Sequence, residues 1–448
     1  MKKFLALTLS ASMALSLAAC TGGNTGSSTS GSTTSSSATS SSTSSTSGTG
    51  TTLKLWSFNV GTLNEKANWD SLIAKFNETN PDIKVEVEII TYADGDTSLS
   101  SAIPAGSGPD ILFEGPERLV GNYGRAGLMV DLSDLWAEGG ADIAEGIKSV
   151  SQLDGKYYMY PLSVAAHCMA INYEVFEQAG ALQYIDQETR TWTTDNFVKA
   201  MEAVRDSGLV ATPGIVYCGA QGGDQGTRAL VNNLYSDYFV NDDGTSYNAN
   251  SANNVKALTL LDEMVGNGSL SANAGFAAAE ELQAFANGTC AVTFCWNYSN
   301  YTQYAAQTQF TPYAVAFPSD DGQPELEMAG PYGFGIFDNG DDAKIEAAKK
   351  FVKFVCDDVT AGTEAVKYTG FFPVHSDWGD IYADAEDADV RAPFAMMSNY
   401  LGRYYNLTGG WTEQRALWWN MLAEILVGGT DPQTAADSYV EQVNANIA

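Results

Sequence analysis

Two hydrophobic periods follow one another in Glu65-Lys-Ala-Asn-Trp-Asp-Ser-Leu-Ile-Ala-Lys-Phe-Asn77 and Ile83-Lys-Val-Glu-Val-Glu-Ile89. The first stretch places Trp69, Leu72, Ile73 and Phe76 at i, i+3, i+4 and i+7, which is typical of an amphipathic helix. In the second stretch apolar and charged residues alternate, which predicts a half-buried strand. Asn80-Pro81 ends the helical period. A helix followed directly by a strand is therefore the unit from which we expect this fold to be built.

The flanking sequence repeats this unit. Leu53-Lys-Leu-Trp56 predicts a short strand before the helix, and Pro109-Asp110 leads into another strand at Ile111-Leu-Phe113. Gly115-Pro116 stops that strand, and a helix can open at Pro116 because proline is well tolerated at the first helical position. Strands that alternate with helices predict an α/β layer with a parallel sheet.

The same alternation continues to the end of the chain. Periodicity predicts strands at 214–218 and 290–295, and helices at 194–207, 253–265, 277–286, 342–357, 413–427 and 432–446. From Leu53 onward the chain has about 400 residues, which exceeds what one hydrophobic core usually supports. We therefore expect two α/β lobes.

The first 52 residues predict export and a tether. Lys2 and Lys3 precede an apolar run that ends in Leu17-Ala-Ala-Cys20, which is typical of a signal peptide over residues 1–20 and of lipidation at Cys20. An ordinary cleaved signal with an accidental cysteine is the alternative. Residues 21–52 are Ser, Thr and Gly with one Ala and one Asn, so they have nothing to bury and predict a disordered tether spanning about 30 Å.

Charge and cysteine content narrow the possible partners. The formal net charge is −31, and a surface this acidic repels nucleic acid and anionic lipid and disfavours a strongly anionic ligand. Five cysteines lie beyond Cys20, an odd number that does not indicate a disulfide framework. Cys290 and Cys295 could pair, but buried free thiols are the preferred interpretation. The two histidines have no metal-ligand spacing, so we expect no metal and no cofactor.

Several segments in a fixed order resemble one known family. They are Leu53–Phe58, Phe76–Val85, Gly106-Ser-Gly-Pro-Asp-Ile-Leu-Phe113, Gly121–Leu128 with Asp131-Leu132, Asp154–Pro161, Ile171–Phe176, Thr191–Thr193, Phe285–Val292, Gly370-Phe-Phe-Pro373 and the two terminal helices. Each motif alone is weak, but together they span nearly the whole mature chain. The sequence resembles the extracellular solute-binding proteins of family 1, the maltose-binding-protein-like carbohydrate receptors of ABC importers.

This resemblance implies a two-lobed, periplasmic-binding-protein-like α/β fold with a discontinuous hinge and a ligand cleft between the lobes. The expected lobes are 53–162 plus about 320–372, and about 163–319 plus 373–448. The resemblance also implies a non-enzymatic, monomeric receptor that delivers a mono- or oligosaccharide to the membrane subunits of an importer. With the lipid anchor, we expect it at the outer face of the cytoplasmic membrane, or in the periplasm if the cell has two membranes.

Candidate ligand-binding residues come first from the carboxyl ends of the predicted strands, where open α/β sheets bind ligands. In the first lobe these candidates are Trp56, Ser57, Phe58, Glu114, Glu117 and Arg118. The resemblance matches Glu117 and Arg118 to a turn that contacts sugar hydroxyls in the family. Helix N-terminal stabilisation for Glu117 and a solvated charge for Arg118 are the structural alternatives.

Aromatic side chains supply the remaining candidates, because sugars stack their C–H faces on flat rings beside polar groups. Trp296 aligns with a stacking tryptophan of the family, and Asn297 is its polar neighbour. Tyr332 lies in the turn Gly330-Pro-Tyr-Gly333. Trp411 is the expected cleft residue of the C-terminal region, whereas Trp418 shares a helical face with Leu422 and Ile425 and can equally be core.

Two departures from the family put maltose itself in doubt. Glu114 stands where the maltose receptor has an aromatic residue, and Val164-Ala-Ala166 replaces a stretch with a family glutamate. His167 follows that stretch and is more simply explained as a structural residue than as a ligand contact.

Two other functions compete with the sugar receptor. An exported glycosidase would need two carboxylates flanking a bond from opposite sides, whereas Glu114 and Glu117 lie one turn apart on one wall. The sequence also has no Gly-x-Ser-x-Gly, HExxH or P-loop motif. A receptor of the same fold for a cationic polyamine or a peptide would use Glu114 and Glu117 with aromatic walls, although Arg118 disfavours a cation.

Overall fold

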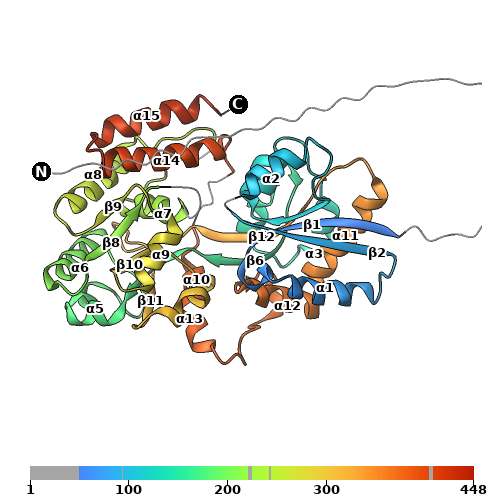
Figure 1. Cartoon of the computed structure of the whole chain (residues 1–448), viewed down its shortest axis with the longest axis horizontal. Helices are drawn as coiled ribbons and strands as arrows, with labels where there is room; N and C mark the ends of the chain where they lie inside the picture. The colour runs from blue at the N-terminus through green and yellow to red at the C-terminus, as the bar shows by residue number, and fades with distance from the viewer. Residues whose placement is uncertain (1–49, 93, 220–223, 242–243, 403–406, 448) are drawn as a thin grey trace, which may run out of the picture. The chain divides into compact units, whose positions relative to one another are not determined.

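The computed structural model describes residues 50–92, 94–219, 224–241, 244–402 and 407–447. The predicted signal peptide, Cys20 and nearly all of the predicted tether 21–52 lie outside these residues. Within the described chain, two sheets with their own helices form two lobes, each with its own hydrophobic core (Figure 1). No helix among the described residues combines the length and the apolar character needed to span a bilayer.

The first lobe is built on a six-stranded sheet in the order β13-β6-β12-β3-β1-β2. Its strands are β1 (Thr51–Phe58), β2 (Ile83–Ile90), β3 (Ile111–Glu114), β6 (Tyr160–Ala166), β12 (Met328–Ile336) and β13 (Phe372–Pro373). Its helices are α1 (Lys66–Asn77), α2 (Gly95–Ala102), the wide turn η2 (Glu117–Gly124), α3 (Ser133–Gly139), α4 (Glu145–Val150), α11 (Asp342–Asp357) and α12 (Val359–Thr369). A two-stranded ribbon is formed by β4 (Gln152–Leu153) and β5 (Lys156–Tyr157).

The predicted parallel pairing is confirmed for β1, β2 and β3, but the complete six-stranded sheet is mixed. Strand β1 pairs parallel with β2 and β3, as the helix–strand alternation predicts. Strand β12 runs antiparallel to both β3 and β6. The reason is the chain path: β12 enters from the second lobe rather than through a crossover helix on the first sheet, and it therefore runs opposite to β3.

Hydrophobic periodicity predicts the positions of most helices and strands correctly. One strand end differs from its predicted position, and this difference affects the site. Helix α1 and strands β2 and β3 fall where periodicity predicts them. Strand β1, however, continues to Phe58, two residues beyond the predicted end. Alternation explains the extension, because Trp56 and Phe58 both pack in a cluster with Leu99 and Leu119.

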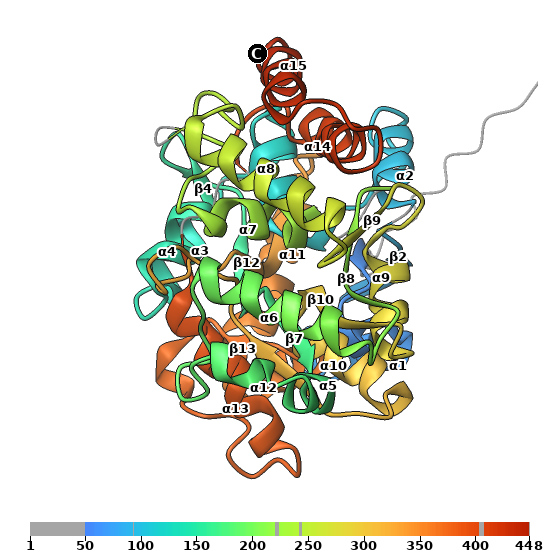
Figure 2. The same cartoon turned by 90° about the vertical axis from the view of Figure 1, so that its left-hand side faces the viewer.

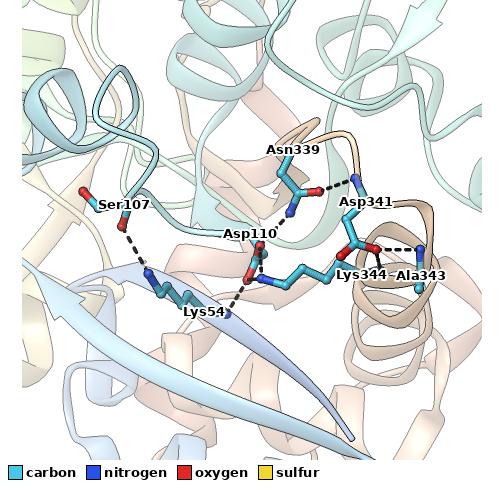
Figure 3. A network of polar contacts seen from close by, with 7 residues as sticks. All are labelled: Lys54, Ser107, Asp110, Asn339, Asp341, Ala343 and Lys344. Atoms are coloured by element: carbon cyan, nitrogen blue, oxygen red, sulfur yellow. Dashed lines mark hydrogen bonds and ion pairs between the residues drawn. The ribbon is translucent and has the colours of Figure 1, made fainter. Parts of the chain in front are cut away.

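Asp110 joins β1, β3 and α11 at the amino end of the parallel strands (Figure 3). Its carboxylate accepts hydrogen bonds from the backbone N of Lys54 at 2.8 Å and from Asn339 Nδ2 at 2.7 Å. Lys344 Nζ lies 3.2 Å from Asp110 Oδ1. A cavity of about 410 Å³ lies beside this network. Because ligands of open α/β sheets bind at the opposite, carboxyl ends of the strands, we assign Asp110 a structural role.

The second lobe is built on a five-stranded sheet in the order β11-β7-β10-β8-β9. Its strands are β7 (Cys168–Asn172), β8 (Thr212–Tyr217), β9 (Ser271–Asn273), β10 (Cys290–Trp296) and β11 (Pro312–Val315). Its helices are α5 (Tyr173–Gln178), α6 (Thr194–Ser207), α7 (Asp224–Leu234), α8 (Ala252–Gly266), α9 (Ala278–Ala286), α10 (Tyr298–Tyr304), α14 (Trp411–Leu426) and α15 (Pro432–Asn444). Across both lobes, short 3-10 turns occur at η1 (Gly61–Asn64), η3 (Ala181–Tyr184), η4 (Ala305–Gln307), η5 (Ser376–Trp378) and η6 (Ser398–Tyr400), of which η1 and η5 pack with the first lobe.

The chain passes between the two sheets three times. His167 is the single residue between β6 and β7, and residues 316–327 connect β11 to β12. After β13 the chain forms α13 (Ala388–Met397) and then reaches α14. In Figures 1 and 2, α14 and α15 lie beside α8 of the second lobe. Both lobes are thus discontinuous in sequence.

Large aromatic side chains fill the two cores. In the first lobe, the Trp69 ring packs edge-on against Phe113 at 5.8 Å. In the second, Trp418 packs on Phe239 at 5.4 Å and donates to Thr227 Oγ1 at 3.0 Å. The alternative that Trp418 belongs to the core is therefore confirmed. The five cysteines of the body are buried free thiols, as the preferred interpretation predicted.

Candidate ligand-binding site

A cavity of about 470 Å³ lies between the two lobes. It opens where β1, β2, β3 and β10 end, the position at which α/β sheets bind small molecules. Its lining residues come from both lobes and are Asn59, Thr91, Tyr92, Glu114, Gly115, Glu117, Arg118, His167, Ala277, Ala278, Ala279, Leu282, Cys295, Asn297, Asn300, Gln303, Tyr304, Met328, Ala329, Gly330, Tyr332 and Arg415.

Arg118 organises the charged part of the first-lobe wall. Its Nη1 donates to Glu114 Oε1 at 2.6 Å, and its Nε and Nη2 donate to the two oxygens of Asp96 at 2.7 and 3.0 Å. The guanidinium carbon also lies 4.5 Å from the Phe58 ring centroid. Arg118 is 2% exposed and Glu114 1% exposed. A guanidinium engaged in this way is a rigid support for the wall rather than a mobile surface charge.

Burial sets the protonation of this cluster. It raises the pKa of Glu114 to about 8, with Arg118 opposing the rise and Glu117 and Asp96 adding to it. Burial alone would lower the pKa of Arg118, but the Glu114 and Asp96 carboxylates outweigh it and the pKa is raised, so Arg118 stays charged. Arg415, from α14 of the second lobe, has its pKa lowered to about 10 by burial and by Arg118. Arg118 and Arg415 therefore both carry positive charge at the cavity, beside the carboxyl groups of Glu114 and Glu117.

The backbone turn after β3 allows a close approach of two groups. A Cβ at Gly115 would lie 2.6 Å from Glu117 Oε2, so any other residue here would require the Glu117 carboxylate to shift. The backbone N of Gly115 also donates to Glu114 Oε2. Since Glu114 Oε1 accepts from Arg118, both oxygens of Glu114 are engaged by the protein.

Two tyrosines form the aromatic part of the same wall. The hydroxyls of Tyr92, which follows β2, and Tyr332, in β12, lie 3.2 Å apart. Burial and the nearby Glu114 carboxylate raise the pKa of both phenols well above the usual value, so both hydroxyls stay protonated. The Tyr332 ring stacks on Phe371 at 5.4 Å with an interplanar angle of 14°. These contacts fix the direction of the hydroxyls at the cavity.

The second-lobe wall is made of amides and small apolar residues. Asn297 caps α10 by accepting from the backbone N of Asn300 at 3.0 Å. Asn300 Oδ1 is buried and has no partner among the described protein groups. Gln303 and Tyr304 follow on the same helix, and Ala277, Ala278 and Ala279 at the start of α9 provide an apolar surface.

His167 lines the cavity at the first chain crossing. Its Nδ1 lies 3.3 Å from the carbonyl oxygen of Trp296, and its Nε2 lies 3.6 Å from Cys295 Sγ. Burial lowers its pKa to about 4, so the ring is neutral at physiological pH. His167 therefore connects the β6–β7 junction to β10 and also lines the cavity.

The structure brings together five of the ten predicted site residues. These are Glu114, Glu117, Arg118, Asn297 and Tyr332, all of which line the cavity. The side chain of Trp411, at the start of α14, lies outside the described part of the structure.

The remaining predicted site residues are placed elsewhere. Trp56, Ser57 and Phe58 belong to β1 itself, and Ser57 Oγ donates to the carbonyl of Phe58 at 3.0 Å. Trp296 is the last residue of β10 and is 0% exposed, with its ring against Phe285 of α9 at 5.6 Å. In both cases the strand extends past the predicted end, and the aromatic side chains point into the lobe cores instead of the cavity.

Several residues that line the cavity were not predicted from the sequence. Asn59 and Tyr92 directly follow β1 and β2, so the carboxyl-end rule would have found them with correct strand ends. Asn300, Gln303 and Tyr304 required knowledge of the start of α10. Arg415 comes from the penultimate helix, and no local signal in the sequence links it to the cavity.

The described chain contains one group of potential metal ligands, Asp142, His375 and Asp377. His375 Nδ1 lies 2.9 Å from Asp142 Oδ1 as an ion pair. None of the three residues lines the cavity between the lobes.

Comparison with known proteins agrees with this architecture. The diacetylchitobiose-binding protein DasA of Streptomyces coelicolor is 29% identical over 131 residues, which is 29% of this chain and 30% of the relative. A solute-binding protein of an ABC transporter from Thermotoga lettingae, bound with α-D-tagatose, has a TM-score of 0.72 at 18% identity over 89% of this chain and 100% of that one. An ABC substrate-binding protein from Listeria monocytogenes, in complex with cycloalternan, has a TM-score of 0.68 at 20% identity over 88% and 98%.

The family model for bacterial extracellular solute-binding proteins matches residues 61–358. This range contains all of β2, β3, β6 to β12 and most of the cavity wall. The solved structures above are solute-binding receptors rather than enzymes, and they share the two-lobed fold. The chain therefore belongs to the bacterial extracellular solute-binding protein family.

Proposed function

We propose that this protein captures a neutral mono- or oligosaccharide between its two lobes and delivers it to the membrane subunits of an ABC importer. The observation that supports this most strongly is the cavity at the carboxyl ends of β1, β2, β3 and β10, which is walled by both lobes. Closure of two such lobes on a ligand is the usual hinge motion of periplasmic binding proteins.

The chemistry of the walls suits a sugar. Hydroxyls of Tyr92 and Tyr332 and amides of Asn297, Asn300 and Gln303 can each donate or accept hydrogen bonds, which matches a ring of sugar hydroxyls. The alanines of α9 offer an apolar surface to a C–H face. The ligands named for the similar proteins, diacetylchitobiose, cycloalternan and α-D-tagatose, are all carbohydrates.

A cationic ligand is less well supported. Both oxygens of Glu114 are engaged by Arg118 and the Gly115 backbone N, so this carboxylate is not presented to a cation. Arg118 and Arg415 add positive charge at the same cavity. The same engagement of Glu114 argues against a glycosidase, whose acid must be available to protonate a leaving oxygen. We therefore propose a receptor without catalytic activity.

The domain limits and the anchor belong to the same proposal. We infer that the two bodies that close follow the expected limits, 53–162 with about 320–372 and about 163–319 with 373–448, shifted so that all of β6 and β13 stays in the first lobe. Residues 1–20 would direct export, Cys20 would receive the lipid, and the predicted tether 21–52, whose last two residues belong to β1, would hold the receptor near the importer. A monomer suffices, because both cavity walls come from one chain.

A thermal-shift screen tests the proposed function. A ligand at about 100 times its Kd stabilises the folded state by about 2.7 kcal/mol, enough for a rise of a few degrees in Tm. We expect a rise with a family of related saccharides and none with spermidine or short peptides. A rise with polyamines or peptides alone would replace the ligand class. Release of reducing sugar from a polysaccharide, lost in Glu114→Gln, would contradict the receptor assignment.

A further inference from the structure

The segment that follows β13 contacts both lobes behind the cavity. It contains α13, which Figure 1 shows in orange-red, and packs against β6 of the first sheet and β11 of the second. On the first-lobe side, Tyr382 Oη donates to the carbonyl of Phe371 at 2.6 Å. On the second-lobe side, Phe394 packs against Tyr298 at 5.7 Å. The segment is thus a physical link between the lobes.

Arg391 lies at the centre of this link, between two tyrosine rings. Its guanidinium carbon is 3.8 Å from the Tyr298 centroid and 3.7 Å from the Tyr382 centroid. Its Nε donates to Asp387 Oδ1 at 2.9 Å, and Asp387 also accepts from Tyr298 Oη. We call Tyr298, Tyr382, Asp387 and Arg391 the Arg391 clamp. The Arg391 side chain is 14% exposed, and cation–π contacts strengthen when water is excluded.

The clamp reaches the first-lobe wall of the cavity in two steps. Tyr382 is bonded to the backbone of Phe371. The Phe371 ring stacks on Tyr332, whose hydroxyl meets that of Tyr92 at the cavity. Movement of Tyr382 relative to the first lobe would therefore displace Phe371 and, through it, Tyr332 at the cavity.

The clamp reaches the second-lobe wall through one short helix. Tyr298 is the first residue of α10, and Asn300, Gln303 and Tyr304 of the same helix line the cavity. Phe394 packs on Tyr301 as well as on Tyr298. Because seven residues of helix move as a unit, the position of Tyr298 determines where the three cavity residues lie.

We propose that the Arg391 clamp sets the separation of the two cavity walls, so that its four residues are positioning residues for the ligand. This inference rests on the proposed function, because it assigns the clamp to the saccharide site. None of the four clamp residues lines the cavity, and the clamp acts through Phe371 and Tyr332 on one side and through α10 on the other. A clamp that sets wall separation must change both the separation and the affinity, and the two are measured independently.

The decisive variant is Arg391→Lys. Lysine keeps the positive charge but lacks the planar group that fills the space between two rings. The matched control is Arg190→Lys, because the Arg190 guanidinium carbon also lies 3.8 Å from a tyrosine centroid, that of Tyr313, and Arg190 does not line the cavity. Tyr382→Phe keeps the ring and removes the hydroxyl that bonds to Phe371 and to Arg391. It is the second variant if Arg391→Lys does not fold.

Wall separation is measured by double electron–electron resonance on the full chain with Cys20→Ser. Spin labels at Leu209→Cys in the second lobe and Val359→Cys in the first are accessible, since these residues are 44% and 60% exposed. The five body cysteines are buried and leave the labelling selective. Affinity is measured by calorimetry with the saccharide that raises Tm most.

We expect Arg391→Lys to broaden or shift the label distance and to weaken saccharide binding about tenfold, with Arg190→Lys matching the wild type in both. Tyr382→Phe should change both in the same direction by a smaller factor. Wild-type affinity or a wild-type distance distribution in Arg391→Lys would overturn the proposal. If no saccharide binds the wild type, the proposed function fails, and an unchanged distance in Arg391→Lys would then overturn the clamp as a separate result.

Discussion

The hydroxyl oxygens of Tyr92 and Tyr332 lie 3.2 Å apart, although 240 residues separate them in sequence. Tyr92 follows β2 and Tyr332 lies in β12, which returns from the second lobe. The two side chains are in contact because the chain returns to the first lobe through β12. This contact places two phenol groups at the ligand cavity.

Replacing Tyr332 with phenylalanine should weaken saccharide binding while leaving the fold intact. The ring and its stacking on Phe371 remain, but one hydroxyl and its hydrogen bonds are lost, which costs about 0.5–1.5 kcal/mol or a two- to tenfold rise in Kd. Calorimetry measures the change. Tyr368→Phe is the matched control, because it removes a hydroxyl bonded to Glu364 in the first lobe, away from the cavity. Equal losses of affinity in both variants would refute the assignment of Tyr332.

Arg118→Met should destabilise the protein severely. Glu114 and Asp96 would lose their guanidinium partner, and breaking a buried ion pair costs about 3–5 kcal/mol. Denaturant unfolding gives the free energy of unfolding. The control Arg205→Met breaks the exposed Arg205–Asp206 ion pair and the hydrogen bond from Arg205 Nη1 to Ser269 Oγ at 2.9 Å, and it should cost far less than Arg118→Met. Similar costs for the two variants would show that Arg118 is not the support described here.

Protonation of His375 should make the free energy of unfolding depend on pH. Burial would lower its pKa, but hydrogen bonds and charges from Asp357 and Asp142 outweigh burial, and the pKa is raised from 6.5. Asp142 lies 2.9 Å and Asp357 3.6 Å from the ring nitrogens. The folded state thus favours the protonated ring, and this stabilisation is fully present below pH 6.5 and is lost as pH rises through the raised pKa.

The measurement compares wild type with His375→Asn across pH. The difference in unfolding free energy should be largest near pH 6 and should shrink towards pH 9. A difference that stays constant over this range would show that the ring does not gain a proton in the folded state.

Substitutions at Trp296 and Asn300 should have opposite effects: the first should lower stability, and the second should weaken ligand binding. Trp296 is in the core, so Trp296→Phe should lower the free energy of unfolding by about 1–3 kcal/mol with little change in Kd. Asn300 lines the cavity, so Asn300→Ala should raise Kd and leave Tm nearly unchanged. The reverse pattern would restore the stacking role that the sequence suggested for Trp296.

The sequence predicted the fold better than the site. Hydrophobic periodicity located α1, α6 and α11, because each has a continuous apolar face against one sheet. The carboxyl-end rule correctly predicted that Glu114 faces the cavity. The same rule chose Trp56 to Phe58 because the end of β1 was placed two residues too early, and one strand register decides which side chains reach the cavity.

Other site residues could not be predicted from local patterns at all. Arg415 and Tyr332 reach the cavity only through tertiary packing of segments far apart in the chain. The resemblance placed Trp296 at a stacking position, yet β10 includes this residue and turns its ring towards Phe285. The sandwich of Arg391 between Tyr298 and Tyr382 likewise joins residues whose spacing has no helical or strand period.

A calorimetric titration shows whether a saccharide binds in the cavity between the lobes. The titration uses wild type and Ala279→Phe, which fills the cavity from α9 without removing a polar group. We predict saturable heat with one saccharide per wild-type chain and no heat with Ala279→Phe at unchanged Tm. No heat with wild type across mono- and oligosaccharides would rule out a saccharide ligand, and equal heat in both proteins would place the binding site outside this cavity.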